Sequence, residues 1–290
     1  MVQRARPPRL SPVAALAAWL LCPFSVALAW GAGQPSLAGP SEIPHLRSAE
    51  VVARDDAPAA RLSFGGRRLG RTQGQSPVFD YDRDGDLDIL LSTHGTMRWL
   101  LMRNHGDGSF AEVRPGTFVK RDRHGCVAGD FGSVGGSGRP DRLVDLYCVI
   151  GAERGLDTEE HPNELFLQRP DRTFTDVAET WGVADPHGRA RAAAALDYDR
   201  DGLPDLAVAN EAPAMLPSPN RLFRNVGGRF EDVADRVVRR ETASECVDAA
   251  DIDQDGWTDL LFCSTSDPLL GVLTYRNVAG AFQDVSLNTA

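Results

Sequence analysis

A nine-residue acidic pattern, D-x-D-x-D-G-x-x-D, occurs three times in this chain and constrains its fold more than any other feature. The three copies occupy residues 80–88, 197–205 and 251–259. Short apolar runs flank them, as Val78-Phe79 and Ile89-Leu90-Leu91 flank the first. Matched copies at one internal spacing indicate a repeat protein, in which each unit needs its neighbours to bury a hydrophobic core.

A degenerate fourth copy lies between the first and second intact copies. Asp130, Asp141 and Asp145 stand for the first, fifth and ninth acids, but Gly132 takes the third position and a glycine-rich insertion lengthens the loop. Copies therefore start at residues 80, 130, 197 and 251. This period of roughly 50 to 70 residues suits a unit of several short strands.

A second landmark recurs in phase with the acidic pattern. Residues 102–113, 223–233 and 275–285 each run through Arg-Asn, a glycine turn and a phenylalanine, and 166–177 is a weaker version. Glycine turns between β-prone runs predict hairpins. Each unit then reads as strand, acidic loop, strand, connection, strand, glycine turn and last strand. Four antiparallel strands per unit predict an all-β, β-propeller-like fold with four blades, at about 76–116, 124–180, 190–236 and 245–287.

Crowded carboxylates on a short loop repel one another and call for a cation. Calcium prefers six to eight oxygen ligands, which the side chains at positions one, three, five and nine and the backbone carbonyl at position seven could supply around a glycine at six. The predicted ligands are Asp80, Asp82, Asp84, Asp86 and Asp88; Asp197, Asp199, Asp201, Leu203 and Asp205; and Asp251, Asp253, Asp255, Trp257 and Asp259. We therefore expect about three Ca²⁺ sites, whereas metal binding by the degenerate loop stays open.

Two alternatives compete with this interpretation. An EF-hand loop begins in the same way but needs an acid at position twelve and helices on both sides. Position twelve is Leu91, Val208 and Phe262 in the three copies, and their flanks are β-prone. A solvated acidic turn is the ordinary alternative for a single copy, and three matched copies argue against it.

The repeats resemble FG-GAP and VCBS repeats, the calcium-looped propeller repeats that also build the heads of integrin α chains. The passage 184–190, the loop that begins at Leu196 and the later segment 220–225 look most like the cartilage acidic protein group. The resemblance covers about residues 60–287 and implies an extracellular calcium-binding propeller. Family propellers commonly close with seven blades, so four recognisable units leave open whether the ring is open or incomplete.

The cysteines test the hairpin interpretation independently, because residues facing each other across an antiparallel hairpin have position numbers with a constant sum. The position numbers of Cys246 and Cys263 sum to one less than those of the two ends of their acidic loop. Cys126 and Cys148 show the same offset in the degenerate unit. We therefore predict the disulfides Cys126–Cys148 and Cys246–Cys263, which a secreted protein can form. Four buried free thiols are the alternative.

The N-terminus has the features of an export signal. Three arginines precede an apolar run that ends at a small-residue cleavage site, which predicts a signal peptide at 1–29, followed by a flexible arm at 30–59 and the repeat domain at 60–290. We expect a secreted, extracellular protein, or a periplasmic one if the source is bacterial. No second apolar run suffices for a membrane span. Cleavage moves the formal net charge from -10 to -13, which argues against nucleic acid as a partner.

Short catalytic signatures are missing from the sequence. It contains neither a G-x-S-x-G elbow nor an H-E-x-x-H zinc helix. We expect a non-catalytic, secreted calcium-binding protein that mediates recognition of, or adhesion to, an extracellular protein, glycan or matrix partner. The alternatives are a carbohydrate-binding propeller, in which Trp99, Trp181 and Trp257 could stack on sugars, and the accessory or catalytic scaffold of an enzyme that degrades polysaccharide or phospholipid. The partner and the oligomeric state stay open.

Overall fold

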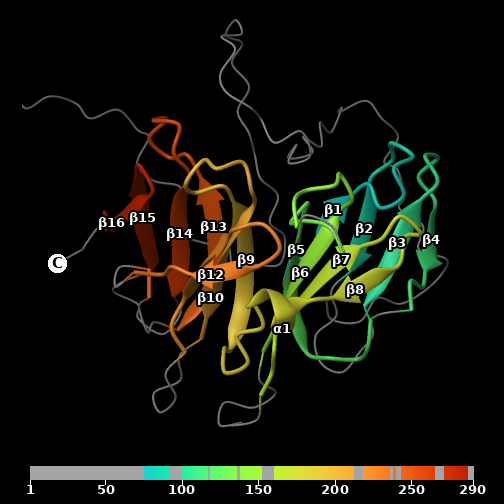
Figure 1. Cartoon of the computed structure of the whole chain (residues 1–290), viewed down its shortest axis with the longest axis horizontal. Helices are drawn as coiled ribbons and strands as arrows, with labels where there is room; N and C mark the ends of the chain where they lie inside the picture. Colours follow the sequence, from blue (N-terminus) through green and yellow to red (C-terminus); the bar gives the residue numbers. More distant parts are fainter. Residues whose placement is uncertain are drawn as a thin grey trace, which may run out of the picture. The chain divides into compact units, whose positions relative to one another are not determined.

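The computed structural model describes residues 75–91, 99–116, 118–135, 138–151, 160–211, 218–235, 238–239, 243–264 and 271–286. The predicted signal peptide and arm lie outside these residues. The described chain forms four separate antiparallel sheets, and each sheet has four strands in sequence order (Figure 1). This is the all-β arrangement of four-stranded, blade-like units that the repeat predicts.

We number the sheets 1 to 4 along the chain. Sheet 1 contains β1 (Val78–Phe79), β2 (Asp88–Leu91), β3 (Leu100–Asn104) and β4 (Phe110–Val113). Sheet 2 contains β5 (Arg123–Gly129), β6 (Asp145–Ile150), β7 (Glu164–Gln168) and β8 (Phe174–Asp176), after which the short helix α1 (Ala178–Trp181) follows. Sheet 3 contains β9 (Ala190–Leu196), β10 (Asp205–Asn210), β11 (Arg221–Asn225) and β12 (Phe230–Asp232). Sheet 4 contains β13 (Ser244–Ala250), β14 (Asp259–Ser264), β15 (Val272–Val278) and β16 (Ala281–Asp284).

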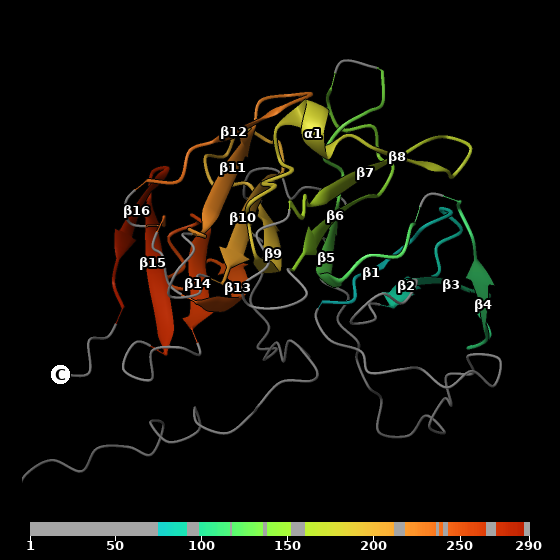
Figure 2. The same cartoon turned by 90° about the horizontal axis from the view of Figure 1, so that it is seen from below.

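The acidic loops join the first two strands of each sheet. The pairing of Phe79 with Asp88, of Leu196 with Asp205 and of Ala250 with Asp259 closes each intact loop at its ninth residue. The degenerate loop lies in the same place between β5 and β6. The repeated motif is therefore a hairpin tip in all four sheets. Figure 2 shows the four sheets from a second side.

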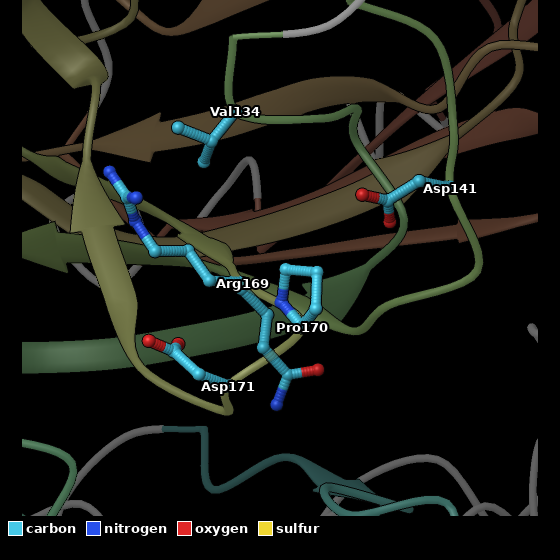
Figure 3. A pocket seen from close by; sticks show the side chains of 6 residues that line it. Val134, Asp141, Arg169, Pro170 and Asp171 are labelled. Atoms are coloured by element: carbon cyan, nitrogen blue, oxygen red, sulfur yellow. The ribbon is translucent and has the colours of Figure 1, made fainter.

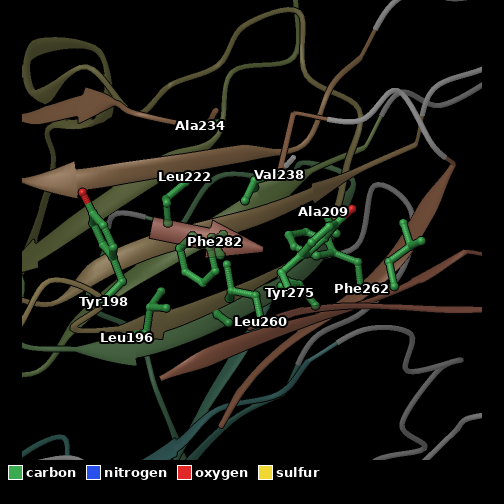
Figure 4. Packing of buried hydrophobic residues seen from close by; sticks show 14 of the residues in the cluster. Leu196, Tyr198, Ala209, Leu222, Ala234, Val238, Leu260, Phe262, Tyr275 and Phe282 are labelled. Atoms are coloured by element: carbon green, nitrogen blue, oxygen red, sulfur yellow. The ribbon is translucent and has the colours of Figure 1, made fainter. Parts of the chain in front are cut away.

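The hydrophobic core lies between neighbouring sheets. One buried cluster contains residues of sheets 1 and 2, a second joins sheets 2 and 3, and a third joins sheets 3 and 4. In the third cluster, Leu196 and Leu222 of sheet 3 and Phe262, Tyr275 and Phe282 of sheet 4 are all at most 6% exposed (Figure 4). Each sheet thus completes the core of its neighbour, as expected of repeats that cannot bury a core alone.

Both predicted cysteine pairs form disulfides in the structure. Cys126 pairs with Cys148 between β5 and β6, and Cys246 pairs with Cys263 between β13 and β14. Both pairs are also register partners in their hairpins, as the position sums require. Within the described part of the chain, no helix has the length and apolar character needed to cross a bilayer.

Candidate metal centres

The three intact loops have the same backbone conformation. Arg83, Arg200 and Gln254 at position four all have a φ of 61°, and the glycines at position six have φ between 85° and 94°. Glycine adopts this left-handed region without the steric cost that a Cβ brings. The carboxylate at position one caps the turn: the amides of Gly85, Gly202 and Gly256 donate to Asp80, Asp197 and Asp251 at 2.8–3.0 Å.

Carboxylate oxygens converge in each intact loop. Three groups each offer oxygens within 4.8 Å of one another, namely Asp80, Asp82 and Asp88; Asp197, Asp199 and Asp205; and Asp251, Asp253 and Asp255. Positions one and three belong to every group, whereas Asp84, Asp201 and Asp259 lie outside them. The structure therefore brings together nine of the predicted ligand side chains, three in each loop. Oxygen-only clusters of this kind are the donor sets that hard cations such as calcium prefer.

Position five supports the turn. The amides of Asp86, Leu203 and Trp257 at position seven donate to Asp84, Asp201 and Asp255 at 2.9–3.0 Å. The bond from Asp86 lowers the pKa of Asp84, and the bond from Trp257 lowers that of Asp255. Both carboxylates are therefore held ionised. Ligation by the position-seven carbonyls stays a prediction.

The ninth acid anchors the loop to the sheet. Both oxygens of Asp205 accept backbone amides, from Tyr198 at 3.0 Å and Asn225 at 2.8 Å, and Asp88 and Asp259 make the equivalent pair of bonds. Burial raises the pKa of Asp88 and raises the pKa of Asp205 to about 8. A divalent cation beside these carboxylates would favour their ionised form. The burial of these acids is therefore easier to explain with a bound metal than without one.

In the intact acidic loops, two buried carboxylate oxygens have no hydrogen-bond partner among the described residues. They are Oδ1 of Asp82, whose side chain is 1% exposed, and Oδ1 of Asp197, whereas Oδ2 of Asp82 pairs with Arg103. A buried acceptor without a donor is costly unless a cation or water satisfies it. Asp82 and Asp197 also belong to the converging groups in the loops of sheets 1 and 3. The convergence of the carboxylates and the buried oxygens without a donor therefore both fit a bound cation.

One arginine flanks each intact loop from the third strand of its sheet. Arg103 Nε lies 2.5 Å from Asp82 and its Nη2 2.9 Å from Asp84. Arg224 makes the same two contacts with Asp199 and Asp201, and Arg276 makes them with Asp253 and Asp255. Each guanidinium therefore spans positions three and five and offsets part of the repulsion between their carboxylates.

The degenerate loop satisfies its acids differently. Asp130 accepts the amides of Asp141 and Arg142 at 2.9 and 2.5 Å, and Asp145 accepts those of Phe131, Gly132 and Gln168. The buried Leu167 stands at the place of the arginine. The insertion thus supplies backbone donors where the intact loops present converging carboxylates, and this loop forms none of the carboxylate groups found in the described residues.

The arginines were not predicted as partners of the acidic loops, although the sequence contains a signal for them. Arg-Asn recurs in phase with the acidic pattern, and the degenerate unit has Leu-Gln instead. Two of the three tryptophans of the sugar-stacking alternative already have packing partners. Trp99 is 2% exposed, because it packs in the core, and the guanidinium of Arg200 lies 3.8 Å above the ring of Trp257.

A surface hollow lies beside the degenerate loop (Figure 3). It is lined by Val134, Asp141, Gln168, Arg169, Pro170 and Asp171. Arg169 already donates to the Thr175 hydroxyl at 2.7 Å. The lining side chains offer carboxylates and a guanidinium but no serine, cysteine or histidine, so they do not supply a nucleophile and a base.

Comparison with known proteins agrees with the repeat architecture. The FG-GAP-like repeat matches at residues 80–144, 139–208 and 197–262. Cartilage acidic protein 1 of Homo sapiens is 33% identical over 122 residues, which are 41% of this chain and 16% of that protein. The same protein of Xenopus tropicalis is 34% identical over 122 residues, 41% of this chain and 17% of its own length.

One solved structure with a similar course of the chain is an Agrocybe aegerita lectin, described as recognising non-reducing terminal N-acetylglucosamine. It has a TM-score of 0.45 and 17% identity, with 82% of this chain and 58% of that chain covered. The three overlapping repeat matches run from residue 80 to residue 262 and take in all four hairpin loops. This chain belongs to the FG-GAP-like repeat family.

Proposed function

We propose that this chain is a secreted, calcium-binding repeat protein in which the ions hold the hairpin tips of sheets 1, 3 and 4. One ion sits in each group of converging carboxylates. Its role is structural: it joins the two strands that flank the loop and neutralises the acids between them. With three ions bound, the charge of the chain cleaved after residue 29 rises from -13 to about -7, which lowers self-repulsion.

The observation that carries this proposal is the pair of buried oxygens, Oδ1 of Asp82 and Oδ1 of Asp197, that accept no hydrogen bond from the described residues. Both residues lie at hairpin tips with matching backbone φ angles, and each loop is flanked by an arginine of its own sheet, Arg103 or Arg224. A turn that were merely solvated would expose these oxygens to water. Calcium rather than magnesium fits, because magnesium demands near-ideal octahedral geometry and keeps several of its waters.

Secretion is supported by the disulfides and by the N-terminal sequence. Cross-strand disulfides persist in oxidising compartments, and both cysteine pairs are bonded. The export signal predicted at 1–29 gives the route.

The chain acts by recognition of an extracellular protein, glycan or matrix component and not by catalysis. The hollow in Figure 3 lacks a nucleophile, and the acids of the loops are committed to backbone amides, arginines and the proposed ions. Calcium would support recognition indirectly by keeping the sheets folded.

The metal part is tested on the secreted chain by calorimetric melting in calcium, in magnesium and in a chelator. Calcium should raise the melting temperature well above both other conditions. Asp82→Asn should reduce the rise, and the matched variant Asp141→Asn in the degenerate loop should leave it intact. Equal melting temperatures in calcium and chelator would refute the metal role.

The recognition part needs its own experiment. The folded chain is immobilised and exposed to extracellular extract, and bound material is compared with that on a heat-unfolded chain. We expect one specific partner that chelation releases. A glycan recovered in shortened form would instead identify an enzyme.

A further inference from the structure

The turn between the last two strands of each sheet has a left-handed residue two positions before the phenylalanine of its last strand. In sheets 1, 3 and 4 this residue is glycine, with a φ of 84° at Gly108, 82° at Gly228 and 88° at Gly280. In sheet 2 it is Arg172, with a φ of 68°. A residue with a Cβ is strained in this region, which glycine enters freely. The arginine of sheet 2 is therefore an outlier among the four turns, and such outliers gather at functional sites.

Arg172 reaches the acidic loop of the neighbouring sheet. Its Nη2 donates to the backbone carbonyl of Asp82 at 3.1 Å, and its Nη1 lies 3.5 Å from Oδ2 of the same residue. Nε of Arg103 in sheet 1 lies 2.5 Å from that same oxygen. Oδ1 of Asp82 is buried and has no hydrogen-bond partner among the described residues. Asp82 therefore faces two guanidinium groups, one from its own sheet and one from the next.

Further contacts hold the turn of Arg172 against this loop. The Tyr81 hydroxyl donates to the carbonyl of Arg172 at 2.6 Å, and the Tyr81 ring stacks on Phe174 with the ring centroids 6.1 Å apart. The side-chain amide of Gln168 donates to the carbonyl of Tyr81 at 3.0 Å. Equivalent bonds join the other neighbouring sheets, and we call these donors the junction amides: Gln168, Asn225 and Asn277, which donate to the carbonyls of Tyr81, Phe131 and Tyr198. The position of the Arg172 guanidinium is thus fixed by the junction between sheets 1 and 2.

The junction between sheets 3 and 4 has the same geometry without the arginine. A Cβ added at Gly280 would lie 4.0 Å from the Cβ of Asp199, which holds position three of its loop as Asp82 does. Among the described residues, Asp199 pairs with one arginine, Arg224 of its own sheet. The same place in the turn therefore faces the same proposed metal ligand in both junctions, and only Arg172 brings a charge to it.

We infer that Arg172 lowers the calcium affinity of the sheet 1 loop from the neighbouring sheet, and that it holds this loop against sheet 2 when no ion is bound. The inference rests on the proposed metal function. A cation held by the carboxylate of Asp82 is repelled by the guanidinium charges that pair with the same carboxylate. Without a cation, those charges offset the repulsion among Asp80, Asp82 and Asp88. Arg172 therefore stabilises the empty loop and opposes its filling.

Calcium titration calorimetry of the purified chain tests the inference. Arg172→Gln removes the charge but keeps a polar side chain, and it should raise the affinity of one site roughly threefold to tenfold, since solvent and salt screen part of the repulsion. Arg172→Lys keeps the charge and should bind calcium as the wild type does. Arg169→Gln is the matched control, because Arg169 lies in the same turn but donates to the Thr175 hydroxyl. It should leave all affinities unchanged.

A second background assigns the effect to sheet 1. Asp82→Ala removes a ligand of that site, so adding Arg172→Gln to it should not change the affinities of the remaining sites. Melting in chelator gives a readout that needs no calcium. There Arg172→Gln should melt at a lower temperature than Arg172→Lys, because the empty loop has lost a counter-charge.

Unchanged affinities in an Arg172→Gln variant that still binds calcium would overturn the inference and leave the proposed metal function standing. A gain in affinity that persists in the Asp82→Ala background would also overturn it, since the effect would then belong to another loop. Equal melting temperatures of the glutamine and lysine variants in chelator would exclude the role of Arg172 at the empty loop. A wild type that binds no calcium would overturn the inference and the proposed function together.

Discussion

Sheets 1 and 2 share strand order and a buried ninth acid but hold their hairpin tips by different means. In sheet 1, three carboxylates converge beside Arg103 and the strands carry no disulfide. In sheet 2, backbone amides satisfy Asp130, the arginine is replaced by Leu167, and Cys126–Cys148 joins the strands. The converging acids and the arginine are therefore both present in sheet 1 and both absent from sheet 2.

Sheet 4 shows that the covalent and ionic devices are compatible. Its loop has converging carboxylates and Arg276, and Cys246–Cys263 joins the same two strands. The carboxylates of this loop are also the most exposed of the three groups. A disulfide does not therefore replace the arginine and acids in general.

Removing the disulfide of sheet 2 should have the largest effect. Replacing Cys126 and Cys148 by serine should cost roughly 3 kcal/mol of unfolding free energy, because the unfolded chain regains the freedom of the closed loop. Calcium should not restore the stability of this variant, because we do not expect the degenerate loop of sheet 2 to bind an ion. Urea unfolding with and without calcium measures both effects. The matched double variant at Cys246 and Cys263 should lose less in calcium than in chelator, and equal losses would contradict the comparison.

Asp82→Ala should abolish the ion of sheet 1, because it removes an oxygen ligand that asparagine would keep. At a calcium concentration about 100 times the dissociation constant, the lost stabilisation should be about 2.7 kcal/mol. In chelator the loss should be smaller, because the lost ion pair with Arg103 is offset by the relief of repulsion among the carboxylates. Asp141→Asn should give the same stability in both conditions, and a calcium-dependent loss there would place an ion in the degenerate loop.

Gln168→Ala should loosen the junction between sheets 1 and 2. It leaves the carbonyl of Tyr81 and the amide of Val144 without their partner, at a cost of about 1–3 kcal/mol. Asn104→Ala removes the equivalent amide of sheet 1, which among the described residues donates to Leu87 of its own loop, and should cost less. Urea unfolding at low protein concentration measures the free energy of unfolding of both variants. A larger loss for Asn104→Ala than for Gln168→Ala would contradict this prediction.

Arg103→Leu copies the residue of sheet 2 into sheet 1 and should have the smallest effect on stability. Arg103 is partly exposed, so its ion pairs contribute about 0–1 kcal/mol in chelator. Calcium affinity at this loop should rise severalfold, because a positive charge beside the cation has gone. Calcium titration calorimetry measures the change, and weaker binding would show that the arginine positions the ligands more than it repels the ion.

The repeat made the sheets and the disulfides predictable. The acidic loop fixes both ends of a hairpin, and that register determines which cysteines face each other. The arginines and the junction amides were not predicted, although Arg-Asn recurs in phase. Asn225 and Asn277 reach carbonyls 94 and 79 residues earlier in the chain, and a local pattern does not report contacts across a whole unit. The contact of the Arg200 guanidinium with the Trp257 ring also joins two units and was not predicted.

The most direct test of the account is the number of calcium ions bound by the purified, folded chain at equilibrium with excess free calcium. The account predicts three ions for the wild type, two for Asp82→Ala and three for Asp141→Ala. A wild type that binds no calcium, or an Asp82→Ala variant that still binds three ions, would contradict it.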